Sequence, residues 1–194
     1  LRGEAVDDAA QGCVPQHEER VAAVRVAGVG LLDDRAVRLE LPDGTFLAES
    51  NAILVYLAHG TPFLPADSAA QASVLQWLFF EQNYVEPVIG ALRHWTLTDK
   101  LARRDPAVIA QRRTAGDHVL DRLDAWLATR DYLAEGCFTL ADLAVYAYAH
   151  RAEDAGFDLT SRLHFRLWIK RISAQGPLPE VVPYSIDPHS VREL

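Results

Sequence analysis

The sequence predicts a fold of class α+β followed by all-α, in which a small part with a β-hairpin and a helix precedes a helical bundle. Two short extended segments, 37–41 and 45–47, flank a Pro-Asp-Gly turn. From residue 67 onward, apolar residues recur only at the spacing of helices. Between the two parts, TPFLPADS (61–68) holds two prolines and is typical of a linker. The chain is therefore predicted to divide near residue 65.

The first part is predicted from its turn and its helix boundaries. In Pro42-Asp43-Gly44, proline pre-sets one turn dihedral and glycine accepts a positive φ, as a β-hairpin requires. Ser50 suits a helix N-cap because its side-chain oxygen accepts a hydrogen bond from a free backbone N–H. Apolar residues follow it at helical spacing as far as Gly60, a common C-terminal stop. We expect a helix between these two residues.

The second part is predicted to hold helices with clear start signals. Thr139 and Asp142 form a close relative of a capping box, with Asp in place of Glu or Gln. Asp105 followed by Pro106 is a cap with proline at the first helical position. The expected helices run from Asp67 or Ser68 to about Trp95, from Pro106 to about Leu127, from Thr139 to about Gly156, and from Ser161 to the Gly176-Pro177 stop, after which the tail is predicted to be extended.

Composition limits the partners and the location. The chain has 194 residues and a formal net charge of −8, which argues against nucleic acid or an anionic membrane as a partner. No apolar run approaches the roughly 18 residues that a membrane helix needs. Cys13 and Cys137 are too few for a disulfide framework, and the seven histidines show no metal-ligand spacing. We expect a soluble cytoplasmic protein without a metal.

A carboxylate and a hydroxyl lie side by side where the hairpin becomes a helix. The N-terminal end of a helix presents free N–H groups and a partial positive charge, which stabilise a ligand carboxylate. Ser50 adds a hydroxyl for that anion, and Glu49 offers a negative charge to an ammonium group. Such a pair can recognise an α-amino acid end. The alternative is that Ser50 is only an N-cap and Glu49 only a solvated charge.

Three stretches of the chain resemble the cytosolic glutathione transferases, especially their bacterial members. LELPDGTFLAESNAILVYLA resembles their β-hairpin, Glu-Ser pair and third helix. VLQWLFFEQNYVEPVIGALRHW resembles the first long helix of their all-helical domain, and FTLADLAVYAYAH resembles its capping motif and buried helix. The resemblance runs from Val37 to about Ala174. It implies a thioredoxin-like, glutathione-binding domain over 1–62 and an all-helical domain over 63–194.

The resemblance implies an activity and partners. The chain would conjugate the glutathione thiolate to a small apolar electrophile, with glutathione as co-substrate and with a homodimer as the assembly. Glu49 and Ser50 would hold the γ-glutamyl end of glutathione. One alternative is a binding or interaction module of the same family without turnover. Another is a glutathione-dependent isomerase, dehalogenase or disulfide reductase, since fold alone does not choose among these.

The chain departs from the family at the groups that handle the sulfur. By the resemblance, Val37 is a candidate glutathione-binding residue, and it stands where the family carries a cis-proline beside the contact to the cysteinyl part of glutathione. A non-proline cis bond costs about 2.5–4 kcal/mol, so the loop is expected to be reshaped or trans. The family's thiol-activating Ser, Tyr or Cys is not found. Cys13 follows no strand and lies too close to Val37 for the missing elements, so an incidental thiol is favoured and the catalytic residue is unknown.

Residues 1–36 do not follow the family pattern. VAAVRVAGVGLL (21–32) fits a helix or a buried strand, and its length does not decide. The Gly28 and Gly30 pair favours a loop because a dinucleotide fingerprint needs a third glycine and a following helix. One hypothesis is a wrong-frame or wrong-start translation fused to an intact family segment, and the chain contains no Met. The alternative is true divergence.

The electrophile pocket is predicted on the first long helix of the bundle. Tyr84 and Trp95 are eleven residues apart and would share a face of a regular α-helix. In the family, the inner face of this helix lines the electrophile site. We therefore predict Tyr84, Trp95 and Arg93 as pocket residues. The alternative is bundle core for the two aromatic residues and solvent for Arg93 and His94.

Overall fold

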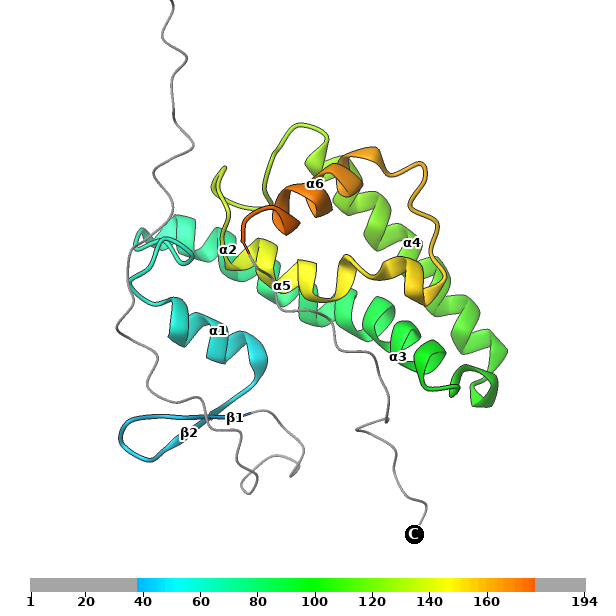
Figure 1. Ribbon diagram of the computed structural model, residues 1–194, viewed down its shortest axis with the longest axis horizontal. Helices are drawn as coiled ribbons and strands as arrows, with labels where there is room; N and C mark the ends of the chain where they lie inside the picture. The colour runs from blue at the N-terminus through cyan, green and yellow to red at the C-terminus, as the bar shows by residue number, and fades with distance from the viewer. Residues whose placement is uncertain (1–37, 177–194) are drawn as a thin grey trace, which may run out of the picture.

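The computed structural model describes residues 38–176, which form a β-hairpin, one helix beside it and a helical bundle (Figure 1). Strands β1 (Arg38–Glu40) and β2 (Phe46–Ala48) pair antiparallel, with Leu39 opposite Leu47. The turn between them contains Gly44 at φ 82°, as the turn sequence predicts. The hairpin prediction is confirmed, with each strand three residues long.

Helix α1 (Ser50–Ala58) follows the hairpin directly. The structure corrects one detail of its start: Glu49 is the N-cap, and Ser50 is the first helical residue. Ser50 was expected as the cap because of its side chain. Instead, the Glu49 carbonyl accepts the first helical hydrogen bond, and the Glu49 side chain makes no capping bond. Most of the thioredoxin-like domain predicted for 1–62, Cys13 and Val37 included, lies outside the described residues.

A long helical rod opens the bundle, and it is not a uniform α-helix. It consists of α2 (Ser68–Phe80), a π-helical segment η1 (Glu81–Gly90) and α3 (Ala91–Leu97). Asp67 caps α2, accepting bonds from two backbone N–H groups at 3.0 Å. The sequence predicted a long helix from Asp67 or Ser68 to about Trp95, and the structure confirms its start and its extent. Only the constant α-helical period assumed along it is wrong: η1 is π-helical, and it contains Pro87, which has no N–H to donate.

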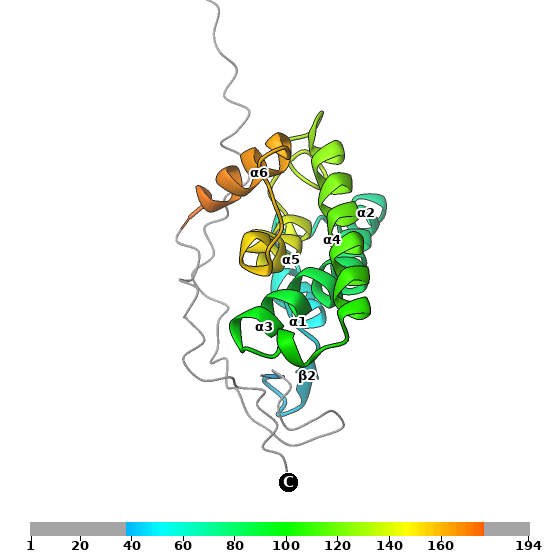
Figure 2. The same cartoon turned by 90° about the vertical axis from the view of Figure 1, so that its right-hand side faces the viewer.

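The remaining helices pack around α5. Helix α4 (Pro106–Leu127) has the predicted bounds, with Asp105 as its cap. Helix α5 (Leu140–Ala149) ends earlier than expected and gives way to a 3-10 turn, η3 (Ala152–Ala155), and α6 (Leu163–Ser173) completes the bundle. A further 3-10 turn, η2 (Leu101–Arg103), joins α3 to α4. Figure 2 shows α5 enclosed by α6, α4 and the rod.

The core lies between these helices and is dense. Trp168, Phe165 and Ile89 are fully buried at its centre. Gly116 on α4 has no room for a side chain, because a Cβ there would overlap the ring of Phe157. No helix within residues 38–176 is long and apolar enough to span a membrane.

Candidate functional site

Glu49 and Ser50 lie exposed directly after the second strand of the hairpin. In its turn, the Asp43 carboxylate accepts bonds from the Thr45 N–H (2.9 Å) and the Thr45 hydroxyl (2.6 Å), which fix the loop. Strand β2 then leads through Glu49 into α1. The Glu-Ser pair therefore lies at the junction of an ordered strand and a helix.

Glu49 has a backbone conformation that most residues avoid. Its φ is 69° and its ψ 118°, and a residue other than glycine held at positive φ typically costs of order 1–3 kcal/mol. Its carbonyl accepts the bond from the Ile53 N–H at 2.9 Å, which closes the first turn of α1. Backbone strain of this kind concentrates at functional sites.

The polar groups at this helix start are exposed in the part of the chain that the structure describes. Glu49 and Ser50 are exposed, and neither side chain has a hydrogen-bond partner among residues 38–176. The first N–H groups of α1 likewise lack a side-chain cap. An exposed carboxylate, a hydroxyl and free amides thus lie together, and this set can pair with the ammonium and the carboxylate of one amino acid end.

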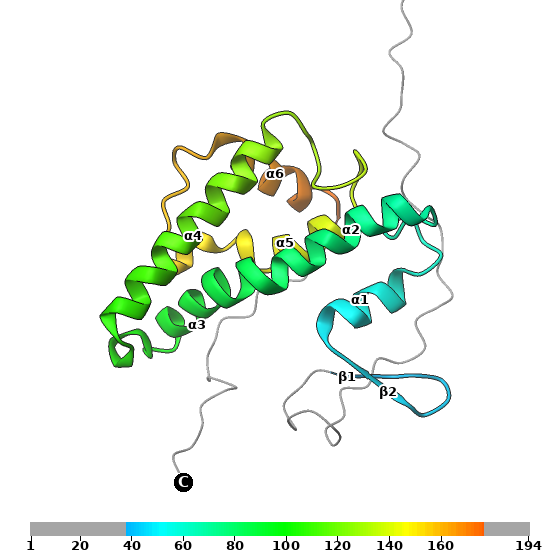
Figure 3. The same ribbon diagram turned by 180° about the vertical axis from the view of Figure 1, so that it is seen from behind.

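The other predicted pocket residues lie on the rod. Tyr84 belongs to η1 and lines two adjoining hollows of about 570 and 450 Å³ between the rod and α4. We call these hollows the aromatic groove. Figure 3 shows α4 running beside the rod at this place. Its lining includes Trp77, Phe80, Tyr84, Val88, Arg122 and Trp126.

Trp95 and Arg93 are in different surroundings from Tyr84. The guanidinium groups of Arg104 and Arg112 lie 4.6 and 4.9 Å from the centre of the Trp95 ring. Nε of Arg93 pairs with Asp154 at 3.0 Å. The π segment changes the helical phase between residues 84 and 95, so their spacing does not place both in the aromatic groove. The electrophile-pocket role of the three residues stays a prediction.

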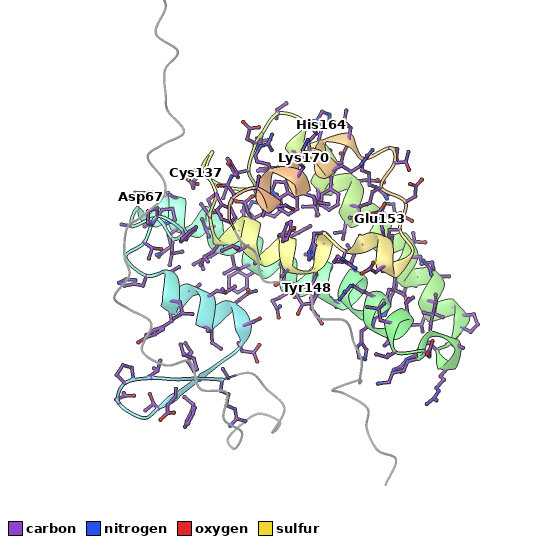
Figure 4. The ribbon with its side chains drawn as sticks, in the orientation of Figure 1. Asp67, Cys137, Tyr148, Glu153, His164 and Lys170 are labelled. Atoms are coloured by element: carbon purple, nitrogen blue, oxygen red, sulfur yellow. The ribbon has the colours of Figure 1, made fainter. Side chains whose placement is uncertain are left out.

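Tyr148 on α5 is a residue that sequence reasoning missed. Figure 4 labels Tyr148 on α5. Its ring lies against Gly90 of the rod, where an added Cβ would come within 2.8 Å of the ring. Glycine at this position lets the two helices approach closely. The sequence pattern around Tyr148 predicts a buried helix but does not indicate this contact with Gly90.

Cys137 is the one cysteine in the described part of the chain. Cys137 is half-buried on the loop that leads to α5 (Figure 4), and Cys13 is outside residues 38–176. The same residues hold no group of three or more His, Cys, Asp or Glu side chains that could bind a metal ion.

Known proteins resemble this chain in sequence and in structure. The family model described as "Glutathione S-transferase, C-terminal domain" matches residues 81–176. A solved glutathione S-transferase from Xanthobacter autotrophicus Py2 is 39% identical, with a TM-score of 0.73, over 77% of this chain and 73% of that one.

Two further relatives are informative about ligands and chemistry. A theta-class glutathione S-transferase from Xanthomonas axonopodis pv. citri, solved with glutathione bound, is 27% identical with a TM-score of 0.60, over 68% of this chain and 70% of that one. The disulfide-bond oxidoreductase YfcG of Escherichia coli is 26% identical over 66% of this chain and 60% of its own. The chain spans about half the length of other curated relatives that it matches.

Proposed function

Because the chain belongs to the glutathione S-transferase family, we propose that it binds glutathione at Glu49 and Ser50 and transfers the thiolate to an apolar electrophile. The observation that carries this proposal is the set of free polar groups at the start of α1, together with the positive φ of Glu49. The similar Xanthomonas protein was solved with glutathione bound. The protein's contribution to the reaction would be a lowered thiol pKa and proximity.

Retention on immobilised glutathione, followed by conjugation of an aryl halide, tests the proposal on the whole protein. We expect retention that free glutathione reverses, and turnover that saturates with glutathione. Retention without turnover would favour the alternative of a binding module. Absence of both would contradict the glutathione site.

Glutathione-dependent disulfide reduction is the second candidate, and the similarity to YfcG favours it. Reduction of a small disulfide by glutathione separates it from conjugation. A rate of disulfide reduction above that of aryl halide conjugation would identify this chemistry. Both reactions use the same glutathione site, so the role of Glu49 and Ser50 is common to them. With only two cysteines, the chain fits a reducing compartment such as the cytoplasm.

A homodimer is part of the proposal. Exposed apolar residues lie on both parts of the chain: Phe79 (67% exposed) and Tyr84 (53%) at the aromatic groove, and Phe46 and Tyr56 on the hairpin and α1. In the family that this chain resembles, the small domain of one subunit usually meets the helical bundle of the other. A second copy placed in this way would cover both sets. Exposed aromatic residues beside a groove are typical of interfaces.

Phe79→Ser is expected to shift the assembly toward monomer in sedimentation at micromolar concentration, because it removes the most exposed aromatic residue of the groove. Leu163→Ser is the matched control, since Leu163 is 55% exposed on α6 and does not line the groove. The wild type sedimenting as a monomer, or an equal shift in both variants, would contradict the proposed interface.

A further inference from the structure

The first turn of α1 is tied to the rod at the place where the rod changes register. Asn51, which follows Ser50 directly, sends its side-chain amide to the rod. Its Nδ2 donates to the Leu78 carbonyl at 3.1 Å and to Oε2 of Glu81 at 2.9 Å. Leu78 belongs to the last turn of α2, and Glu81 is the first residue of η1. One side chain thus joins the candidate ligand site to two points of the bundle.

Glu81 is an unusual partner for this contact. It is 1% exposed, and its Oε1 is buried without a hydrogen-bond partner in the part of the chain that the structure describes. Its Oε2 accepts bonds from Asn51 and from Nε2 of Gln82, each at 2.9 Å. Burial raises the pKa of Glu81, while these two hydrogen bonds act in the opposite direction. A buried carboxyl with one unpartnered oxygen costs stability, and groups of this kind gather at functional sites.

The contact between Asn51 and Glu81 lies where the rod changes from α-helix to π-helix, which supports a functional role for it. π-helical segments are rare, and those found inside α-helices are frequently at functional sites. Asn83, also in η1, donates its amide to the Phe79 carbonyl at 2.8 Å, so two asparagine side chains bind carbonyls of the last α2 turn. Only Asn51 reaches there from another element.

We propose that Asn51 and Glu81 are positioning residues of the ligand site, which hold the first turn of α1 against the rod so that its free amides and the Ser50 hydroxyl face glutathione. The proposal rests on the proposed function for the identity of the ligand. If the first turn of α1 is ordered before glutathione binds, no binding free energy is spent on ordering it. When only a fraction of the molecules has the ordered turn, the apparent affinity for glutathione is reduced to that fraction of its full value. Loss of the tie should therefore act on glutathione affinity and leave the rate at saturation nearly unchanged.

Asn51→Ala and Gln82→Ala form a matched pair. Each removes an amide that donates to the same Glu81 oxygen at 2.9 Å, but only Asn51 belongs to α1. We expect Asn51→Ala to raise the KM for glutathione about tenfold, with kcat changed less than about twofold. Gln82→Ala should change neither by more than about twofold. Glu81→Ala should resemble Asn51→Ala, and Glu81→Gln, which keeps an acceptor oxygen, should restore most of the affinity.

A measurement without ligand separates this inference from the proposed function. Hydrogen exchange of the amides from Ile53 to Tyr56 should be about tenfold faster in Asn51→Ala than in the wild type, and unchanged in Gln82→Ala. Equal exchange in the two variants, or equal effects on KM, would overturn the positioning role. If the wild type does not bind glutathione but the exchange rates differ as expected, the proposed function fails while the tie between α1 and the rod stands.

Discussion

Replacing Asp142 by alanine is expected to lower the free energy of unfolding by about 4 kcal/mol, the largest effect of any single substitution predicted for this chain. Asp142 has no exposed surface and joins three parts of the bundle. Its Oδ1 accepts bonds from the Leu133 N–H (3.0 Å) and from Nε1 of Trp168 (2.8 Å). Its Oδ2 accepts the bond from the Thr139 N–H (3.1 Å), which completes the capping box of α5.

The size of the effect follows from what alanine leaves behind. Three buried donors lose their acceptor, and each buried unpaired donor costs about 1–3 kcal/mol. Trp168 and Thr139 are themselves fully buried, so water cannot easily replace the carboxylate. Burial raises the pKa of Asp142, and the hydrogen bonds from Trp168, Leu133 and Thr139 oppose that rise. Within residues 38–176 the carboxyl is held by these hydrogen-bond donors.

Denaturant unfolding of Asp142→Ala and Asp124→Ala measures this effect. Asp124 is the matched control because it also bridges to α6 but accepts a single bond, from the Phe165 N–H at 2.9 Å. We expect a loss of about 1 kcal/mol for the control. Losses within about 0.5 kcal/mol of each other would contradict the view that Asp142 anchors α5 to α6.

The double variant Glu49→Gln, Ser50→Ala is expected to weaken glutathione binding about 30-fold while the fold survives. Both side chains are exposed, and neither has a hydrogen-bond partner within residues 38–176, so their removal breaks no described contact. The loss combines one exposed charge pair and one hydroxyl hydrogen bond. Titration calorimetry gives the affinity, and far-ultraviolet circular dichroism monitors the fold.

The chain offers a matched control for this variant. Ser68 is the first residue of α2 after its N-cap, as Ser50 is of α1, and Glu40 on β1 carries the same charge as Glu49. Glu40→Gln, Ser68→Ala therefore changes the net charge and a helix start by the same amount. It should leave glutathione affinity within about twofold of the wild type. Equal weakening by both double variants would show that charge or helix stability, and not a site, is responsible.

The elements that the sequence predicted well are those with strong local signals. The Pro-Asp-Gly turn, the Asp105-Pro106 start of α4 and the capping box of Thr139 and Asp142 depend on residues a few positions apart. Such signals act before tertiary contacts form, and the structure confirms them. The Glu-Ser pair also lies where the pattern placed it, at the start of α1.

The features that the sequence did not predict depend on distant contacts. Asn51 meets Glu81 across 30 positions, and Trp168 meets Asp142 across 26. The shared face predicted for Tyr84 and Trp95 assumed a constant α-helical period, which η1 interrupts. A glutamate within the apolar run of α2 and η1 was the one signal that could have drawn attention to Glu81.

The central claim is that the Glu49 carboxylate pairs with the ammonium group at the γ-glutamyl end of glutathione. Calorimetric titration of the wild type and of Glu49→Gln with glutathione, and with the same tripeptide lacking its α-amino group, tests this claim most directly. The account predicts that loss of the amino group weakens binding to the wild type about fivefold and binding to Glu49→Gln less than about twofold. The same loss of affinity in both proteins would contradict it, because the ammonium group would then bind elsewhere.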